Sequence, residues 1–110
     1  MPSRVRNVAK KSDRTYKGVV YDSKAEMLRA FELDALKAAG KIISWERQVP
    51  FVLSVRGIVI CKFVVDFKVK ERPGVEYYEE IKGWETPEYK LKLKLFRAIY
   101  QNVDYRIINV

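Results

Sequence analysis

Two short segments in the middle of the chain carry acidic side chains in a pattern that suits metal-ion chemistry. Asp66 lies in the run Phe-Val-Val-Asp-Phe-Lys-Val, and Glu80 and Lys82 lie in the run Tyr-Tyr-Glu-Glu-Ile-Lys-Gly. If both runs are strands, residues two apart share a face, so Glu80 and Lys82 point one way and Glu79 points the other. A Pro-Gly turn between the runs would let Asp66 and Glu80 converge on one surface.

Carboxylates in such an arrangement are suitable ligands for a hard cation. Mg²⁺ binds through one or two carboxylates and keeps several waters and substrate phosphate oxygens as its other ligands. We therefore expect Asp66 and Glu80 to hold Mg²⁺, which Mn²⁺ can replace, with the backbone carbonyl of Ile81 as a further ligand. The cation would polarise a phosphate and lower the pKa of a bound water. Lys82 would position that water or stabilise developing charge.

The same three side chains also have an explanation that involves no catalysis. Asp66, Glu80 and Lys82 could form a cross-strand salt bridge, which contributes at most about 1 kcal/mol on a surface. An acid-x-Lys triplet is frequent by chance in a chain of which 33% is charged. The triplet gains weight from its position after an acid-bearing strand, in a basic chain that contains no histidine.

The composition excludes several classes of protein and of catalytic site. A chain of 110 residues with 48% hydrophobic residues indicates one folded domain. The lack of histidine removes Ser-His-Asp and Cys-His catalysis and His-ligated zinc. The single cysteine, Cys61, cannot form an intrachain disulfide or a Cys-based zinc site. Because no apolar run suits a membrane span or a signal peptide, we expect a soluble, cytoplasmic protein without a membrane partner.

The net charge of +8 and the pI near 9.6 predict a polyanionic partner, with nucleic acid ahead of an acidic membrane. Residues 1–14 are expected to form a mobile basic arm, and residues 15–110 a single domain. Further basic residues gather on one side of the predicted second helix, where the alternative is a solvated charged face. The residues expected to contact nucleic acid are Arg4, Arg6, Lys10, Lys11, Lys17, Lys90, Lys94 and Arg97.

Two helices are predicted from their caps and apolar spacing. The first runs from Ser23 to about residue 39, with Ser23 as N-cap and Glu26 in the capping-box position. The second opens at Thr86, which is followed by a proline at the first helical position. The first helix shows helical spacing of Leu28, Phe31, Ala35 and Ala39. The expected buried stripe of the second helix is Leu91, Leu95, Phe96, Ala98 and Ile99.

Four strands complete the predicted fold. Alternating or continuous apolar runs mark them at residues 49–55, 58–69, 75–82 and 105–110. The second run is apolar on both faces, which is typical of a central strand, and Arg56-Gly57 is a hairpin turn before it. The prediction is an α/β fold in the order α-β-β-β-α-β, with a mixed central sheet flanked by helices.

Taken in order, these segments resemble the PD-(D/E)XK, or restriction-endonuclease-like, nuclease superfamily. The resemblance covers residues from about Tyr16 to the end of the chain, and is closest to small phage and archaeal endonucleases related to Holliday-junction resolvases. Val65 stands where the name-giving proline would be, a position at which the superfamily varies. The segments that carry the likeness are Ser23-Lys24-Ala25-Glu26, Val65-Asp66-Phe67, Glu80-Ile81-Lys82-Gly83 and the run from Thr86 to Lys94.

The resemblance implies catalytic roles for Glu26, Asp66, Glu80 and Lys82, and a Mg²⁺-dependent DNA endonuclease that acts as a homodimer on branched DNA. Glu26 keeps two explanations, a helix cap and a site acid. Gln48 falls where some relatives carry a polar site residue, although it could simply begin a strand. The alternatives to this function are a non-catalytic nucleic-acid-binding module and a nuclease acting on single-stranded DNA or RNA.

Overall fold

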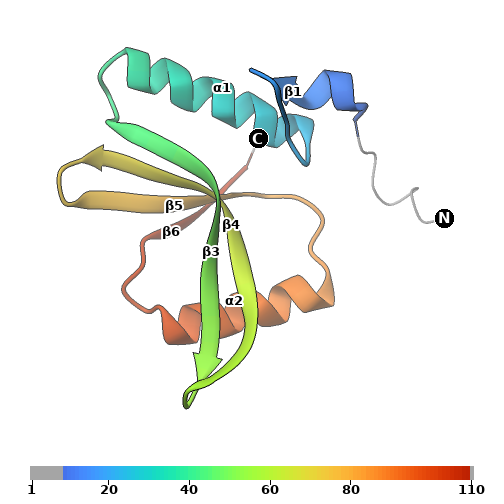
Figure 1. Ribbon diagram of the computed structural model, residues 1–110, viewed down its shortest axis with the longest axis vertical. Helices are drawn as coiled ribbons and strands as arrows, with labels where there is room; N and C mark the ends of the chain where they lie inside the picture. Colours follow the sequence, from blue (N-terminus) through green and yellow to red (C-terminus); the bar gives the residue numbers. More distant parts are fainter. Residues whose placement is uncertain (1–8, 110) are drawn as a thin grey trace.

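A four-stranded mixed sheet forms the centre of the computed structural model, which describes residues 9–109 (Figure 1). Its strand order is β3-β4-β5-β6. β3 pairs with β4 and β4 with β5 in antiparallel fashion, whereas β6 runs parallel to β5. The mixed sheet and the interior position of β4 confirm the expectation from the sequence. The strands are Ser44–Val55 (β3), Ile58–Arg72 (β4), Val75–Ile81 (β5) and Tyr105–Ile108 (β6).

The two predicted hairpin turns are present and follow from their residue types. Arg56 (φ 53°) and Gly57 (φ 81°) both lie in the left-handed region, as a two-residue turn between twisted antiparallel strands requires. At the other turn Pro73 precedes Gly74, whose φ is 78°, and Arg72 pairs with Val75 across it. These turns fix the register of β4 against both neighbours.

Both helices begin where their caps predict. Helix α1 spans Lys24–Ala38, and the Ser23 hydroxyl accepts a hydrogen bond from the Glu26 backbone N–H at 3.0 Å. Helix α2 spans Pro87–Ile99, and the Thr86 hydroxyl accepts from the Tyr89 N–H at 3.0 Å. No helix in the described part of the chain has the length and apolar character that crossing a membrane would require.

A short hairpin precedes α1 and was not part of the predicted order. It consists of β1 (Thr15–Tyr16) and β2 (Val19–Val20), and a 3-10 helix, η2 (Lys11–Arg14), comes before it. The Arg14 side chain donates to the carbonyl oxygens of Ala9 and Tyr21, which ties this segment to the start of α1. The last residues of the expected basic arm are therefore folded onto the domain, and residues 1–8 lie outside the described part.

The core is divided into two clusters, one that includes residues of α1 and one that includes residues of α2. Figure 1 shows these two helices on either side of the sheet. Phe67 and Val69 of β4 belong to the cluster under α1, whereas Phe63 and Val65 belong to the cluster that contains Phe96 of α2. All four β4 residues are buried, as their alternation predicts, but they do not share one partner. The division falls at Asp66, so the site residue lies at the junction of the two clusters.

The expected buried stripe of α2 is largely wrong, and the residues whose spacing marked α1 are exposed. On α1, Leu28 and Phe31 are 47% and 57% exposed, and the ring of Phe31 packs edge-on against Tyr16 of the small hairpin. On α2, Leu91 is 68% exposed, and of the expected stripe only Phe96 is buried, with Leu95 packed beside it. The buried residues of α1 are Glu26, Ala30 and Leu33. Ala35, Ala39, Ala98 and Ile99 are exposed.

Candidate active site

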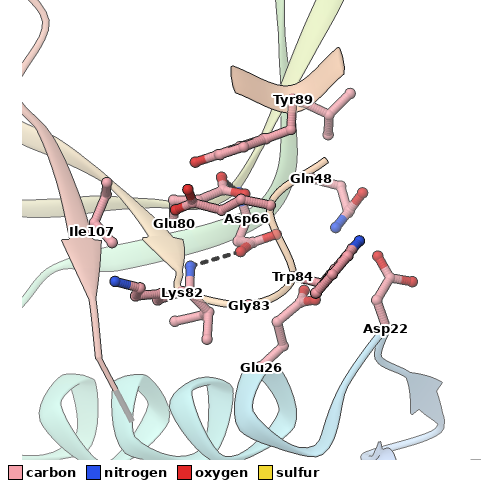
Figure 2. Close-up of a pocket in the computed structure, with 13 residues that line it drawn as sticks. Asp22, Glu26, Gln48, Asp66, Glu80, Lys82, Gly83, Trp84, Tyr89 and Ile107 are labelled. Carbon is pink, nitrogen blue, oxygen red and sulfur yellow. Dashed lines mark hydrogen bonds between the residues drawn. The ribbon is translucent and has the colours of Figure 1, made fainter. Parts of the chain in front are cut away.

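A cavity of about 320 Å³ gathers side chains from α1, the three antiparallel strands and the loop before α2 (Figure 2). This volume is at the lower end of the range for ligand sites. The four predicted catalytic residues, Glu26, Asp66, Glu80 and Lys82, all line it, as does Gln48. The other lining residues are Asp22, Val64, Ile81, Gly83, Trp84, Glu85, Tyr89 and Ile107.

Asp66 and Glu80 are held by hydrogen bonds to each other's strand. The Ile81 backbone N–H donates to Asp66 Oδ2 at 2.8 Å, and the Asp66 N–H donates to Glu80 Oε1 at 3.3 Å. The regular β4–β5 ladder runs only as far as the pair Phe67 and Glu79, so beyond it these N–H groups need other acceptors. The two carboxylates satisfy them, which fixes both acids at the point where the strands separate.

Glu79 lies on the opposite face of β5, as the alternation predicts. It is 1% exposed and accepts two hydrogen bonds from Arg29 of α1, from Nε at 2.8 Å and from Nη2 at 2.7 Å. This bidentate pair joins α1 to the back of the strand that carries Glu80. Glu79 is thus a structural residue that supports the site strand.

Glu26 faces the cavity instead of the helix terminus. It is 7% exposed, and its Oε1 atom is buried without a hydrogen-bond partner among the described residues. A reciprocal capping bond would satisfy that oxygen, so the local explanation of Glu26 as the second half of a capping box accounts for only its backbone N–H. A buried carboxylate oxygen without a partner is costly to the folded protein and is typical of a site that expects a ligand.

Gln48 adopts an unusual backbone conformation next to the acids. Its φ is 55°, in the left-handed region, although it lies in the middle of β3. The register places it opposite Asp66, between the pairs Arg47–Phe67 and Val49–Val65. A non-glycine residue in this region is strained, and such strain is concentrated at functional sites. The distortion directs the Gln48 side chain into the cavity (Figure 2).

Burial raises the pKa of Glu26, Asp66 and Glu80, and repulsion from neighbouring carboxylates adds to the shift of each. Burial is the largest cause in each case, and brings the pKa of Glu26 and of Glu80 to about 8 and that of Asp66 to about 6. The charge of Asp66 adds to the effect on both glutamates, while Arg47 and the Ile81 N–H act in the opposite direction on Asp66. In the metal-free cavity the protonated forms of these acids are therefore favoured, because nearby protein cations do not fully offset the cost of burying their charge.

Lys82 lines the cavity but does not pair with the acids. Within residues 9–109, no salt bridge joins Lys82 to Asp66 or Glu80, and Lys82 is exposed. The cross-strand salt bridge that would have explained the triplet without catalysis is therefore absent from the described structure. Its ammonium group is available to a substrate.

The acids suit a hard cation that takes some ligands from the protein and the others from water and substrate. No three ligating side chains in the described residues converge closely enough to form a complete protein cage. Mg²⁺ does not need one, because one or two carboxylates and a phosphate are its usual partners. The unpartnered Glu26 oxygen and the raised pKa values of Asp66 and Glu80 are what a cation or its bound water would relieve.

Of the predicted nucleic-acid contacts, those within residues 9–109 do not line the cavity. Arg4 and Arg6 lie outside the described residues. Lys17 makes a 3.3 Å salt bridge with Asp34, and Arg97 lies over the ring of Tyr105 at 5.3 Å. The exposed residues among the set are Lys10, Lys11, Lys17, Lys90, Lys94 and Arg97. A shallower hollow beside the cavity, shared through Val64 and Tyr89, is lined instead by Lys62 and Lys92.

Three ionisable cavity residues were not singled out from the sequence. Asp22 immediately precedes the N-cap of α1, Glu85 lies in the loop after β5, and Tyr89 lies in the first turn of α2. Tyr89 also makes a 3.1 Å hydroxyl contact with Tyr105 beside Glu80. Each of them lies close in sequence to a predicted site residue or to the start of a helix. This proximity could have identified them, because the starts of both helices meet at the cavity.

Comparison with known proteins places the chain in a family but assigns it no activity. A search of curated protein sequences finds no match to this chain. A family model described as "Protein of unknown function (DUF1064)" matches residues 4–109. Since this match spans nearly the whole sequence, the chain belongs to the DUF1064 family.

Proposed function

We propose that this protein is a Mg²⁺-dependent endonuclease of restriction-endonuclease-like fold that hydrolyses phosphodiester bonds in DNA. The observation that carries the proposal is the meeting of Glu26, Asp66 and Glu80 from three separate elements in one cavity. Their raised pKa values, and the absence of a salt bridge from Lys82 in the described residues, set them apart from a structural cluster.

Asp66, Glu80 and the Ile81 carbonyl would hold the cation, which supplies a Lewis acid for the phosphate and a lowered pKa for a bound water. Glu26 accepts a proton or a hydrogen bond from the attacking water through its unpartnered oxygen. Lys82 stabilises charge that develops on the phosphate oxygens. Gln48, held opposite Asp66, orients the water or the strand by hydrogen bonds.

The proposal also includes a branched-DNA substrate and a homodimeric protein. The resemblance to Holliday-junction resolvases supports the substrate. The dimer is supported by exposed apolar residues on β4, from Ile58 to Ile60, on a stretch whose second edge pairs with no strand among the described residues. Two copies would bring two cavities to two of the strands of a junction.

A non-catalytic nucleic-acid-binding module is the second candidate, favoured by the exposed basic residues Lys90, Lys94 and Arg97 on α2. In that case the acids would be structural. The net charge of +8 serves both functions equally, so binding alone does not distinguish them.

Cleavage assays distinguish the two candidates. The protein is incubated with branched, nicked, linear and single-stranded DNA and with RNA, with Mg²⁺ or with chelator. We expect Mg²⁺-dependent cleavage that Asp66→Asn and Glu80→Gln each abolish while binding persists. Glu46→Gln, which removes an exposed acid on β3 outside the cavity, is the matched control. Cleavage that survives both site substitutions, or that chelator leaves unchanged, contradicts the proposal.

A second readout follows metal binding without cleavage. Ca²⁺ or Mg²⁺ at about 100 times its dissociation constant should stabilise the wild-type protein by about 2.7 kcal/mol, and Asp66→Asn should lose this gain. Thermal unfolding measures it. An equal gain in both proteins would place metal binding elsewhere.

A further inference from the structure

The two tryptophans of the chain occupy opposite environments. Trp45 is half-buried, donates its indole N–H to Asp34 Oδ1 at 2.9 Å and packs edge-on against Phe67 at 5.7 Å. Trp84 is 61% exposed, and among the described residues it has neither a hydrogen-bond partner nor an aromatic partner. Trp45 is therefore explained by packing, whereas Trp84 is not.

The position of Trp84 relates its exposed side chain to the candidate site. A single exposed apolar residue is common and needs no explanation by itself. Trp84, however, lies in the loop between β5 and α2, two residues after Lys82, and lines the cavity that holds the acids. Figure 2 shows its ring beside Gln48 and Glu26, with Tyr89 bordering the carboxylates from another side.

Trp84 itself carries no charge with which to bind a phosphate. Five acidic side chains line the cavity against the single cation of Lys82. An uncharged aromatic surface can instead attract the flat face of a nucleobase, and such stacking tolerates any base sequence. In a continuous duplex both faces of each base are already covered by neighbours, so only an unstacked nucleotide offers a face to Trp84.

We propose that Trp84 stacks on an unpaired nucleobase next to the phosphate bound at the acids, so that the site selects nucleotides outside a continuous duplex. This inference rests on the proposed nuclease function and names its substrate class: single strands, flaps and the unpaired nucleotides of branch points. Because stacking carries no net charge, Trp84 adds affinity without adding to the salt dependence of binding.

The test measures affinity in the Asp66→Asn background, where cleavage does not consume the ligand. Each protein is titrated with a single-stranded DNA, the same sequence as a duplex, a single-stranded RNA, and an abasic strand that keeps the phosphates. Trp84→Ala should weaken single-strand binding about fivefold to 100-fold with an unchanged salt slope, and leave duplex and abasic-strand binding unchanged. Trp84→Phe should retain part of the affinity. Leu91→Ala, which truncates a 68% exposed residue outside the cavity, is the matched control.

Tryptophan emission provides a measurement that needs no truncated side chain. The base-containing single strand should quench the emission of the Asp66→Asn protein more than the abasic strand does, and Trp84→Phe should remove the difference. If Trp84→Ala weakens binding of both RNA and DNA single strands, stacking on the base occurs with either sugar. If it weakens binding of DNA alone, the stacking site also selects DNA. Equal losses for single strand and duplex, or equal quenching by intact and abasic strands, would overturn the inference.

The two proposals fail separately. Metal-dependent cleavage with no role for Trp84 would leave the nuclease and remove the substrate selection. Base-dependent quenching in a protein that never cleaves would leave the stacking site and remove the nuclease.

Discussion

The Glu26 side chain does not complete the helix cap and instead takes part in the candidate site. The Ser23 hydroxyl caps α1, and the Glu26 carboxylate turns toward Asp66 from the first turn of the helix. The pKa of Glu26 is raised from its usual 4.5 to about 8, so the folded protein holds this proton more tightly than the unfolded chain does. Its contribution to stability is therefore complete below about pH 4.5 and is lost as the pH rises toward 8.

Glu26→Gln should remove this pH dependence from the metal-free protein. The amide cannot ionise, so in chelator the variant should unfold at a higher temperature than wild type at pH 8 and at nearly the same temperature at pH 5. Cleavage should fall by roughly 100-fold or more if Glu26 handles the proton of the attacking water. Thermal unfolding at the two pH values measures the first effect. The exposed control Glu46→Gln should show neither, and an equal shift in both variants would contradict the assignment.

At the scale of elements, β5 is held from behind by a buried ion pair. The Glu79 side chain is 2% exposed and that of Arg29 is 18% exposed, so removal of one partner leaves the other charge poorly solvated. We expect Glu79→Leu to destabilise the protein by roughly 3 kcal/mol in urea unfolding. The double variant Glu79→Leu with Arg29→Met should recover much of this loss, because no unpaired charge remains. A double variant no more stable than Glu79→Leu would show that packing, not charge, dominates there.

The helices and turns could be predicted from neighbouring residues, whereas the buried faces of the helices depend on long-range packing. Caps at Ser23 and Thr86 and turns at Arg56-Gly57 and Pro73-Gly74 depend on neighbouring residues, and each is present. Helix faces depend on what lies opposite. The buried residues of α1 are Glu26, Ala30 and Leu33, because the candidate site and the core lie on that side, whereas Leu28 and Phe31 remain exposed.

The geometry of the candidate site was predictable only in part. Alternation along β4 and β5 correctly separated Glu80 from Glu79. It could not show that the ladder ends at Phe67, that Gln48 takes a left-handed conformation, or that Tyr89 returns to the cavity. These features depend on the separation of the strands and on where α2 docks, neither of which has a local signal.

At the scale of the whole molecule, positive charge and negative charge are segregated. The chain carries a net charge of +8, but the cavity is acidic and the cations are spread over outer surfaces such as α2. If Lys90 and Lys94 contact phosphates, replacing both with alanine should reduce the slope of log affinity against log salt by about one or two contacts. Lys37→Ala with Lys41→Ala removes the same charge from the end of α1 and serves as the control. Equal slopes in the two double variants would show that α2 is merely solvated.

The geometry of the sheet bears directly on how two copies of the molecule would form the proposed homodimer. β4 pairs with β5 only from Phe67 to Arg72, and Ile58, Val59 and Ile60 are 66%, 63% and 55% exposed before that stretch. An exposed apolar edge of this kind pairs readily with a second copy, and a charge on it is the usual means of preventing that pairing. Ile60→Lys should therefore convert the proposed homodimer to a monomer, measured by light scattering over a range of protein concentrations. Phe31→Lys places the same charge on another exposed apolar surface, on α1, and should leave the dimer intact. Dissociation by Phe31→Lys alone would move the interface to α1, where the two cavities would be arranged differently around a branched substrate.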